Sequence, residues 1–239
     1  MKLSVVIPVY NERETLGKVI QAVKAVSLDM EKEIIVIDDG STDAIASVIS
    51  NLQFSISNQF SNVKIFKNQT NRGKGFSIRR GFAEATGDII LIQDADLEYD
   101  PKDYPVLLGP ILEDKAEVVY GSRFIGDQPR RVLYNHHYMA NKFLTFCSNL
   151  FSNINLSDME TGYKVFSRAA LDAILPCLSA NRFGIEVELT AQIAKHKLRV
   201  YEVGISYRGR TYEEGKKITW KDGAAALWHI IRYNILRRH

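Results

Sequence analysis

The residues best suited to chemistry in this 239-residue chain form four polar clusters, each of which follows a short apolar run. The clusters are residues 8–12, 38–41, 71–75 and 93–96. Asp, Asn and Gly also favour turns for local backbone reasons, so a single cluster would indicate little. Four in succession indicate a binding site, because ligands gather beyond the carboxyl ends of the strands in an open α/β sheet.

Asp94 and Asp96 are the candidates for a metal site. If the backbone stays extended after the apolar run, side chains two residues apart leave on the same side and can share a divalent cation. Mg²⁺ or Mn²⁺ suits carboxylate oxygen and takes its remaining ligands from substrate phosphate. The alternative is a helix-capping cluster ahead of Pro101.

The segment Arg72-Gly73-Lys74-Gly75 is basic and rich in glycine, which suits close approach of the backbone to a phosphate. It lacks the Gly-x-x-x-x-Gly-Lys-Ser/Thr spacing of a P-loop, and no Gly-x-Gly-x-x-Gly follows the first apolar run. These absences argue against an ATPase and against a classical dinucleotide-binding enzyme.

The elements that must position these clusters are short β-branched runs alternating with amphipathic stretches. This alternation predicts a single compact α/β domain with a mostly parallel central sheet flanked by helices. We expect strands over residues 3–7, 33–37, 63–66, 89–92, 118–120, 163–166 and 200–206. We expect helices over residues 15–26, 43–56, 76–85, 101–112, 131–151, 184–195 and from Trp220 onwards. No linker rich in Pro, Gly or Ser separates residues 1–120 from 121–239, so both halves should share one core.

Composition and charge exclude several classes of protein. Hydrophobic residues make up 46% and charged residues 25%, which is ordinary globular usage rather than that of a disordered or coiled-coil chain. A formal net charge of +3 is too balanced for a dedicated nucleic-acid binder. Cys147 and Cys177 are too few for a disulfide scaffold. No stretch approaches the roughly 20 apolar residues of a spanning helix or has the form of a signal peptide. We therefore expect a cytoplasmic protein, unless the sequence is a fragment of a longer one.

The clusters together resemble the family 2 glycosyltransferases, which share the nucleotide-sugar-binding GT-A fold. The matching segments are residues 5–12, 37–43, 71–75 and 94–98, in the order found in that family. Within the family the chain is most similar to the dolichyl-phosphate or polyprenyl-phosphate mannosyl- and glucosyltransferases. Looser matches at residues 119–124, 160–166, 208–210 and 214–218 carry that closer similarity.

The resemblance implies a Rossmann-like sheet in which residues 1–120 bind a nucleotide sugar and residues 121–239 bind the acceptor. The implied reaction is metal-dependent transfer of a hexose from a UDP- or GDP-linked sugar to a polyprenyl or dolichyl phosphate, with inversion. Transfer to a saccharide hydroxyl in cell-surface polysaccharide synthesis is the alternative within the family. A catalytically inactive nucleotide-sugar-binding subunit is a third interpretation, which the intact Asp94 and Asp96 oppose.

The resemblance also implies roles for individual residues. The nucleotide-sugar-binding residues would be Pro8, Tyr10, Glu12, Asp38, Asp39, Arg72, Lys74 and Asp94, with Asp39 nearest the base. Asp94 and Asp96 would hold Mg²⁺ or Mn²⁺ on the diphosphate, and Arg123, Arg131, Arg210 and Lys217 would bind the acceptor phosphate. The catalytic candidates are Asp96, Arg123, Arg131 and Glu160.

Glu160 matters only for one class of acceptor. A sugar hydroxyl needs a general base, for which Glu160 is available, whereas a lipid phosphate is already an anion and needs none. The other interpretation of Glu160 is a loop carboxylate paired with a cation. The chain also departs from the lipid-phosphate enzymes, with Glu98 in place of Gln, Asn135 in place of Ser, and residues 160–164 in place of Thr-Ser-Gly-Phe-Arg.

The C-terminal segment, residues 208–239, carries eight lysine and arginine residues against three acidic residues. From Trp220 it resembles one amphipathic helix, with Ala224, Leu227, Trp228, Ile231 and Ile235 near one stripe. A basic amphipathic helix that bears Trp can lie on a membrane surface, which would make the protein peripheral on the cytoplasmic face. The alternatives are packing of the stripe on the core, with solvated cations, and recruitment by a membrane partner.

Overall fold

The computed structural model describes residues 1–43, 45, 62–126, 128–132, 134–211, 213–214 and 220–236 of the chain. Most of the expected helix over residues 43–56 lies outside the described residues, and so does Lys217.

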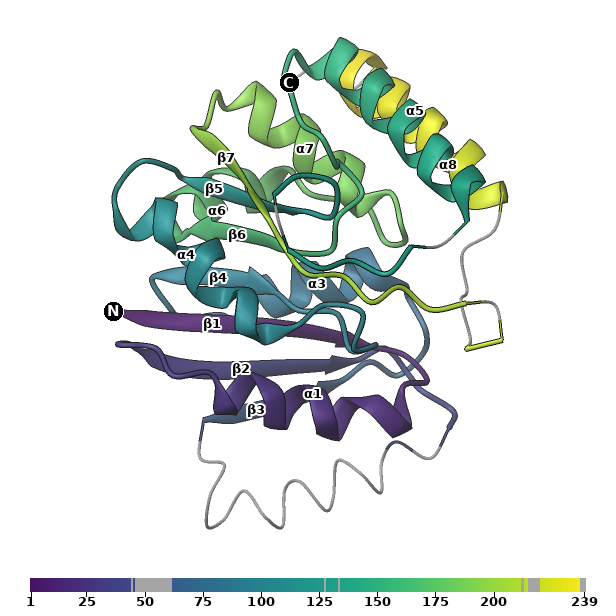
Figure 1. Ribbon diagram of the computed structural model, residues 1–239. Helices are drawn as coiled ribbons and strands as arrows, with labels where there is room; N and C mark the ends of the chain where they lie inside the picture. The colour runs from purple at the N-terminus through teal and green to yellow at the C-terminus, as the bar shows by residue number, and fades with distance from the viewer. Residues whose placement is uncertain are drawn as a thin grey trace.

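The described residues form one seven-stranded sheet in the order β3-β2-β1-β4-β6-β5-β7 (Figure 1). Its strands are β1 Lys2–Val9, β2 Glu31–Asp38, β3 Val63–Lys67, β4 Ile89–Ile92, β5 Val118–Ser122, β6 Lys164–Ser167 and β7 Val200–Gly204. Among these strands β6 alone runs antiparallel to its neighbours, β4 and β5. The mostly parallel sheet expected from the sequence is therefore confirmed, with each strand ending within two residues of its expected bounds.

Two hydrophobic clusters cover the two faces of the sheet. The side chains of successive strand residues point to opposite faces, so Val5 belongs to one cluster and Val6 to the other. The helices α1 Arg13–Ala25 and α4 Tyr104–Leu112 pack on the first face. The second face is covered by α3 Lys74–Glu84, α5 Asn135–Ser152, α6 Arg168–Ile174, α7 Ile185–Lys195 and α8 Trp220–Ile231. Burial on both faces explains why the central strands are continuous runs of Val and Ile.

The helix expected over residues 131–151 begins later, at Asn135. The preceding segment is extended, because Arg130 bridges Tyr207 and the Arg131 N–H donates to the Tyr207 carbonyl at 2.8 Å. Arg131 therefore lies beside the chain that follows β7 and not on a helix.

The C-terminal helix is confirmed from Trp220, but its α-helical part ends at Ile231 and continues as a π-helical turn, η3 Arg232–Leu236. It packs beside α5 on the outer side of the molecule (Figure 1). Its buried residues are Ala226, Ile230 and Tyr233, whereas Trp228 and Ile231 face outward.

Candidate functional site

The loops that follow β1 and β2 are joined by hydrogen bonds at the carboxyl edge of the sheet. The Asn11 N–H donates to Ser41 Oγ at 3.0 Å, and the Thr42 N–H donates to Asn11 Oδ1 at 2.8 Å. Asn11 has φ of +54°, a left-handed conformation that Asn adopts more readily than most side chains. Pro8 is buried in β1, and the exposed ring of Tyr10 lies at the edge of this joined pair of loops.

Asp39 positions the glycine-rich segment. Its buried carboxylate accepts hydrogen bonds from Asn68 Nδ2 at 2.8 Å, the Arg72 N–H at 3.0 Å and the Gly73 N–H at 2.6 Å. Gly73 has φ of +99°, which a larger side chain would strain, and α3 begins directly after it. Asp38 accepts from the Ser41 N–H through Oδ1, while its buried Oδ2 makes no hydrogen bond.

Lys74, the first residue of α3, joins the two halves of the chain. Its ammonium lies 2.9 Å from Asp94 Oδ1 and 2.9 Å from Glu186 Oε1 on α7. Burial alone would lower the pKa of Lys74, but the two carboxylates raise it well above the usual value. Lys74 is therefore held as a cation beside Asp94.

Asp94 and Asp96 come together by a different geometry from the one expected. The chain leaves β4 at Ile92 and turns at residues 95–96 instead of staying extended, and Leu97 takes φ of +62°. The carboxylates nevertheless interact, since burial first, and then the charges of Asp94 and Glu98, raise the pKa of Asp96 to about 7. An isolated carboxylate at Asp96 is thus disfavoured, and a neighbouring cation would stabilise it.

This donor set fits a divalent cation that shares its ligands with a phosphate. No cluster of three or more His, Cys, Asp or Glu side chains suited to a metal ion is found in the described part of the chain. Mg²⁺ commonly binds through one or two carboxylates and completes its shell with water and substrate phosphates. Two mutually repelling carboxylates at the open edge of the sheet match that requirement.

Arg210 lies against acidic residues of the N-terminal half. Its guanidinium is 3.0 Å from Glu12 Oε2 and 3.9 Å from Asp96 Oδ2, and the backbone N–H of Arg210 donates to Glu98 Oε1 at 2.8 Å. Tyr207 donates to Glu98 Oε2 at 2.8 Å. The structure thus brings Arg210 to the residues expected to bind the donor, whereas we expected it among those that bind the acceptor.

Arg123 and Arg131 are placed differently from one another. Arg123 forms a bidentate pair with buried Asp158, with N···O distances of 2.6 and 2.7 Å. Arg123 holds the pKa of Asp158 below its usual value, against the effect of burial. Arg131 is half-exposed and pairs with Glu214 at 2.7 Å. Arg123 is a fixed internal cation, and Arg131 is a cation at the surface.

Glu160 belongs to a buried group of charges beneath the loop that precedes β6. Its Oε1 makes no hydrogen bond, and burial together with Glu186 raises its pKa to about 7. Lys164 donates to the carbonyls of Met159 and Thr161, and burial lowers its pKa to about 8 although Glu186 and Glu160 oppose the change. Glu160 is therefore a carboxyl group that can exchange a proton near neutral pH.

Sequence reasoning missed Asp158, Lys164 and Glu186. Glu186 lies on a helix without any cluster of polar residues to mark it, and Lys164 lies in an otherwise apolar strand. Asp158 lies two residues before the segment 160–166 that resembles the lipid-phosphate enzymes, and Lys164 lies within it, which is the one available signal for these two residues.

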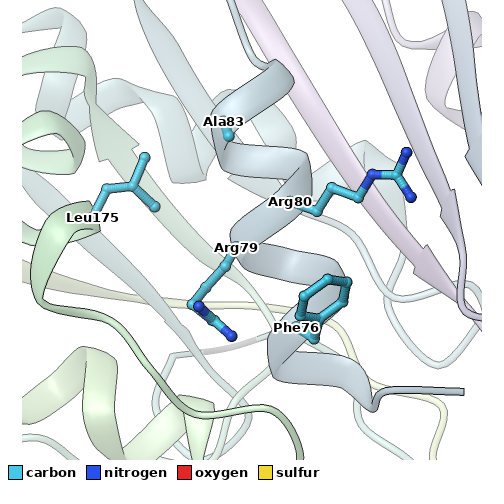
Figure 2. A pocket seen from close by; sticks show the side chains of 5 residues that line it. All are labelled: Phe76, Arg79, Arg80, Ala83 and Leu175. Atoms are coloured by element: carbon cyan, nitrogen blue, oxygen red, sulfur yellow. The ribbon is translucent and has the colours of Figure 1, made fainter. Parts of the chain in front are cut away.

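A surface hollow of about 330 Å³ lies beside α3 and contains none of the expected site residues (Figure 2). Phe76, Arg79, Arg80, Ala83 and Leu175 line it. Both arginines are already engaged, Arg79 with Asn181 Oδ1 at 2.7 Å and Arg80 with Asn68 Oδ1 at 2.6 Å. The hollow therefore has the character of a packing gap between α3 and the segment after α6.

Comparison with known families identifies the class of enzyme. The family model described as Glycosyl transferase family 2 matches residues 4–175, most of the chain. The chain belongs to glycosyltransferase family 2. This glycosyltransferase is 29% identical over 98% of its length to the low-salt glycan biosynthesis hexosyltransferase Agl6 of Haloferax volcanii. It is 28% identical over 90% of its length to a dolichyl-phosphate beta-glucosyltransferase of Dictyostelium discoideum. A dolichol-phosphate mannosyltransferase of Pyrococcus furiosus is 27% identical over 91% of the chain.

The chain spans only part of the length of these relatives. It spans 53% of the Haloferax protein, 68% of the Dictyostelium protein and 61% of the Pyrococcus protein. Among solved structures it resembles glucosyl-3-phosphoglycerate synthase of Mycobacterium tuberculosis, with a TM-score of 0.71 and 20% identity. That alignment covers 98% of this chain and 80% of the synthase. The likeness confirms the GT-A fold expected from the sequence.

The described residues include no helix whose length and apolar character would let it traverse a bilayer.

Proposed function

We propose that this glycosyltransferase moves a hexose from a UDP- or GDP-linked sugar to a polyprenyl phosphate, with inversion at the anomeric carbon. The observation that carries the proposal is the pair Asp94 and Asp96 at the sheet edge, each flanked by a cation, Lys74 and Arg210 respectively. The two dolichyl-phosphate transferases among the relatives support the choice of acceptor.

The donor would bind across the carboxyl ends of β1, β2 and β4. Asp94 and Asp96 would hold Mg²⁺ or Mn²⁺, the ions present with UDP in structures of the mycobacterial synthase. A divalent cation bound at this position would neutralise the negative charge that develops on the departing nucleoside diphosphate. Lys74 and Arg210 are fixed beside the same position, so their charges need no reorganisation during the reaction.

The acceptor would approach from the side of residues 121–239. A phosphate oxygen forms the new bond to the anomeric carbon as the bond to the diphosphate breaks, and the leaving electron pair stays on the nucleoside diphosphate. Because the nucleophile is already anionic, the chain has only to orient it. The guanidinium of half-exposed Arg131 could donate two parallel hydrogen bonds to that phosphate. Arg123, which Asp158 holds in place, would add positive charge on the protein side of the site. Such a substrate would place the enzyme at the cytoplasmic face of a membrane.

A saccharide hydroxyl is the second candidate acceptor, and one observation favours it. Glu160 has a buried oxygen without a hydrogen bond and a pKa raised to about 7, as a general base requires. In that reaction Glu160 would take the hydroxyl proton as the new glycosidic bond forms.

The deciding experiment incubates radiolabelled UDP- and GDP-hexoses with Mn²⁺ and offers polyprenyl phosphate or an oligosaccharide mixture in detergent. We expect label in the organic phase for polyprenyl phosphate. Glu160→Gln should retain most of that activity, whereas transfer to a hydroxyl should fall roughly a hundredfold in the same variant. Label found only in the water-soluble fraction, and lost with Glu160→Gln, establishes the second candidate instead.

A further inference from the structure

The loop between α5 and β6, residues 153–163, has no regular secondary structure. Its backbone N–H and C=O groups still need hydrogen-bond partners, and side chains of neighbouring elements provide several of them. Thr145 Oγ1 on α5 accepts from the Met159 N–H at 3.2 Å, and the Tyr99 hydroxyl accepts from the Gly162 N–H at 2.8 Å. The position of the 153–163 loop therefore depends on residues outside it.

Asp158 connects this loop to the proposed acceptor site. Its buried carboxylate accepts hydrogen bonds from Arg123 Nε at 2.6 Å, Nη2 at 2.7 Å and the backbone N–H at 3.1 Å. The hydroxyls of Ser122, the last residue of β5, and Ser157 are hydrogen-bonded at 2.6 Å. A shift of the loop would therefore move the carboxylate that orients the Arg123 guanidinium.

Glu202 on β7 holds the loop at Asp158. Its Oε1 accepts from the Ser157 N–H at 3.0 Å and from the Asp158 N–H at 3.1 Å, and its Oε2 accepts from the Ser157 N–H at 3.0 Å. β7 pairs in parallel with β5, so the strand that carries Glu202 is joined to the strand that leads into Arg123. Loop, carboxylate and cation are thus connected through hydrogen bonds to one pair of strands.

The negative charge of Glu202 is unfavourable at this position. Burial raises the pKa of Glu202 and the neighbouring Asp158 carboxylate adds to that effect, although the hydrogen bonds from the loop N–H groups oppose it. A carboxylate that loses water beside a second carboxylate costs free energy, which its charge-assisted hydrogen bonds to the loop offset. We therefore expect Glu202 to act through the position of the loop and not through its charge.

The chain that continues from β7 also holds the second acceptor cation. The Arg131 N–H donates to the Tyr207 carbonyl at 2.8 Å, and Arg131 Nη1 donates to the Gly209 carbonyl at 3.3 Å. β7 and the segment after it therefore contribute to the positions of both cations that we propose for the acceptor phosphate.

We propose that Glu202 is a positioning residue, which holds the Asp158 carboxylate where it orients Arg123 toward the acceptor phosphate. The inference rests on the proposed function, in which Arg123 acts on an anionic acceptor. It goes further by tracing the position of Arg123 through Asp158 to a carboxylate on the edge strand of the sheet.

The test compares Glu202→Ala with Glu202→Gln in transfer to polyprenyl phosphate. Alanine removes both acceptor oxygens, whereas glutamine keeps one oxygen, which at the position of Oε1 accepts from both N–H groups. We expect Glu202→Ala to raise the acceptor KM roughly tenfold and to leave the donor KM unchanged. Glu202→Gln should restore the acceptor KM to within about threefold of the unaltered chain. If Glu202→Ala does not fold, Glu202→Asp takes its place, because its carboxylate is one methylene too short.

The matched control is Glu117→Ala. The Glu117 carboxylate also accepts from a backbone N–H, that of Arg199 at 2.8 Å, but at the amino end of the same pair of strands. This variant should leave both KM values unchanged. A loss of stability by itself would not separate the acceptor KM from the donor KM, so the split between them identifies a positioning role.

Two further measurements follow the connection itself. Arg123→Lys keeps the charge and loses the planar fork that Asp158 binds, so adding Glu202→Ala to it should raise the acceptor KM no further. Hydrogen exchange at the Ser157 and Asp158 amides should be faster in Glu202→Ala but not in Glu117→Ala. Exchange requires no acceptor and therefore tests the contact separately from the proposed function.

The outcomes distinguish the two proposals. An unchanged acceptor KM in Glu202→Ala, an equal rise of both KM values, or effects of Glu202→Ala and Arg123→Lys that add, overturns the positioning role. Failure of Glu202→Gln to restore the acceptor KM assigns the effect to charge and overturns it as well. Absence of transfer to polyprenyl phosphate by the unaltered chain contradicts the proposed function, and amide exchange then decides whether Glu202 holds the loop.

Discussion

At the scale of single residues, the carboxylate of Asp96 is the strongest test of metal-dependent transfer. We expect Asp96→Asn to lower transfer roughly a hundredfold or more, since the variant loses a charged group that we propose as a ligand of the cation. Thermal unfolding without metal should be unchanged or slightly higher, because burial, Asp94 and Glu98 all disfavour this carboxylate. Asp172→Asn, at an exposed position on α6, is the matched control. Near-normal turnover of Asp96→Asn contradicts the assignment.

Glu160 should make the stability of the protein depend on pH. Its pKa is raised from 4.5 to about 7, so the folded state holds a proton that the unfolded chain has already lost in this range. The free energy of unfolding therefore decreases as the pH rises from about 4.5 to about 7. Relative to the unaltered chain, Glu160→Gln should gain stability from about pH 5 to about pH 8, as measured by urea unfolding. A difference that is constant with pH contradicts the raised pKa.

Arg131 is the half-exposed cation that we propose to act on the acceptor. Arg131→Ala should raise the acceptor KM or lower turnover by roughly tenfold and leave donor affinity unchanged. Its exposed ion pair with Glu214 is screened by water and contributes little to stability, so the fold should be little affected. Arg199→Ala removes a comparable exposed pair with Asp114 and serves as the control. An effect on nucleotide binding alone would place Arg131 outside the acceptor site.

The sequence located the residues that follow the strands but not their partners. The proximity of Asp94, Asp96 and Lys74 could be predicted because strand ends are recognisable and parallel strands bring such residues to one edge. The contact between Arg210 and Glu12 spans 198 residues, and nothing in local periodicity predicts which cation crosses such a distance. The same holds for Glu186, whose carboxylate reaches Lys74 from a helix on the other half of the chain.

At the scale of elements, the loop between α5 and β6 packs closely against the side chain of Asp94. A Cβ at Gly162 would lie 2.3 Å from Asp94 Oδ2 and 2.9 Å from the Tyr99 ring. We expect Gly162→Ala to displace that carboxylate, to lower transfer roughly tenfold or more and to destabilise the fold by about 1–3 kcal/mol.

The control for this prediction is Gly223→Ala in α8, where a Cβ meets nothing within 4 Å. A mid-helix glycine costs about 0.5–1 kcal/mol relative to alanine, so this variant should be at least as stable as the unaltered chain and fully active. Equal activity of the two variants would show that the loop does not position Asp94. Steady-state transfer assays and urea unfolding measure both quantities.

The positions of strands with continuous apolar runs are predicted well from the sequence. The buried side of a helix is predicted less well when the helix is apolar on two sides. The expected stripe of the C-terminal helix contains Trp228, Ile231 and Ile235, but the structure buries Ala226 and Ile230 instead. A period of 3.6 residues identifies a helix, yet it cannot decide which of two apolar sides meets the core. The start of α5 was misplaced for a similar reason, because the pairing of Arg130 with Tyr207 is a long-range contact.

At the scale of the whole molecule, the two halves of the chain are interleaved. β6, from the C-terminal half, lies between β4 and β5, and its pairing with both closes one continuous sheet. Ion pairs across the halves, Lys74 with Glu186 and Arg210 with Glu12, lie at the edge where we propose that the donor binds. A donor bound at this edge, as we propose, would contact groups whose positions depend on both halves.

This interleaving predicts that a nucleotide stabilises the halves together. We expect UDP or GDP, whichever binds, to raise the free energy of unfolding by about 2.7 kcal/mol when Mn²⁺ is present and the nucleotide concentration is a hundred times the dissociation constant. Hydrogen exchange should then slow in β7 and α7 as well as in β1 and β2, because opening either half breaks the shared sheet. Asp96→Asn with the same nucleotide should lose the added protection in both halves at once. Protection confined to β1, β2 and β4 would show that the halves open independently, and that the contacts of Lys74 and Arg210 do not couple donor binding to the C-terminal half.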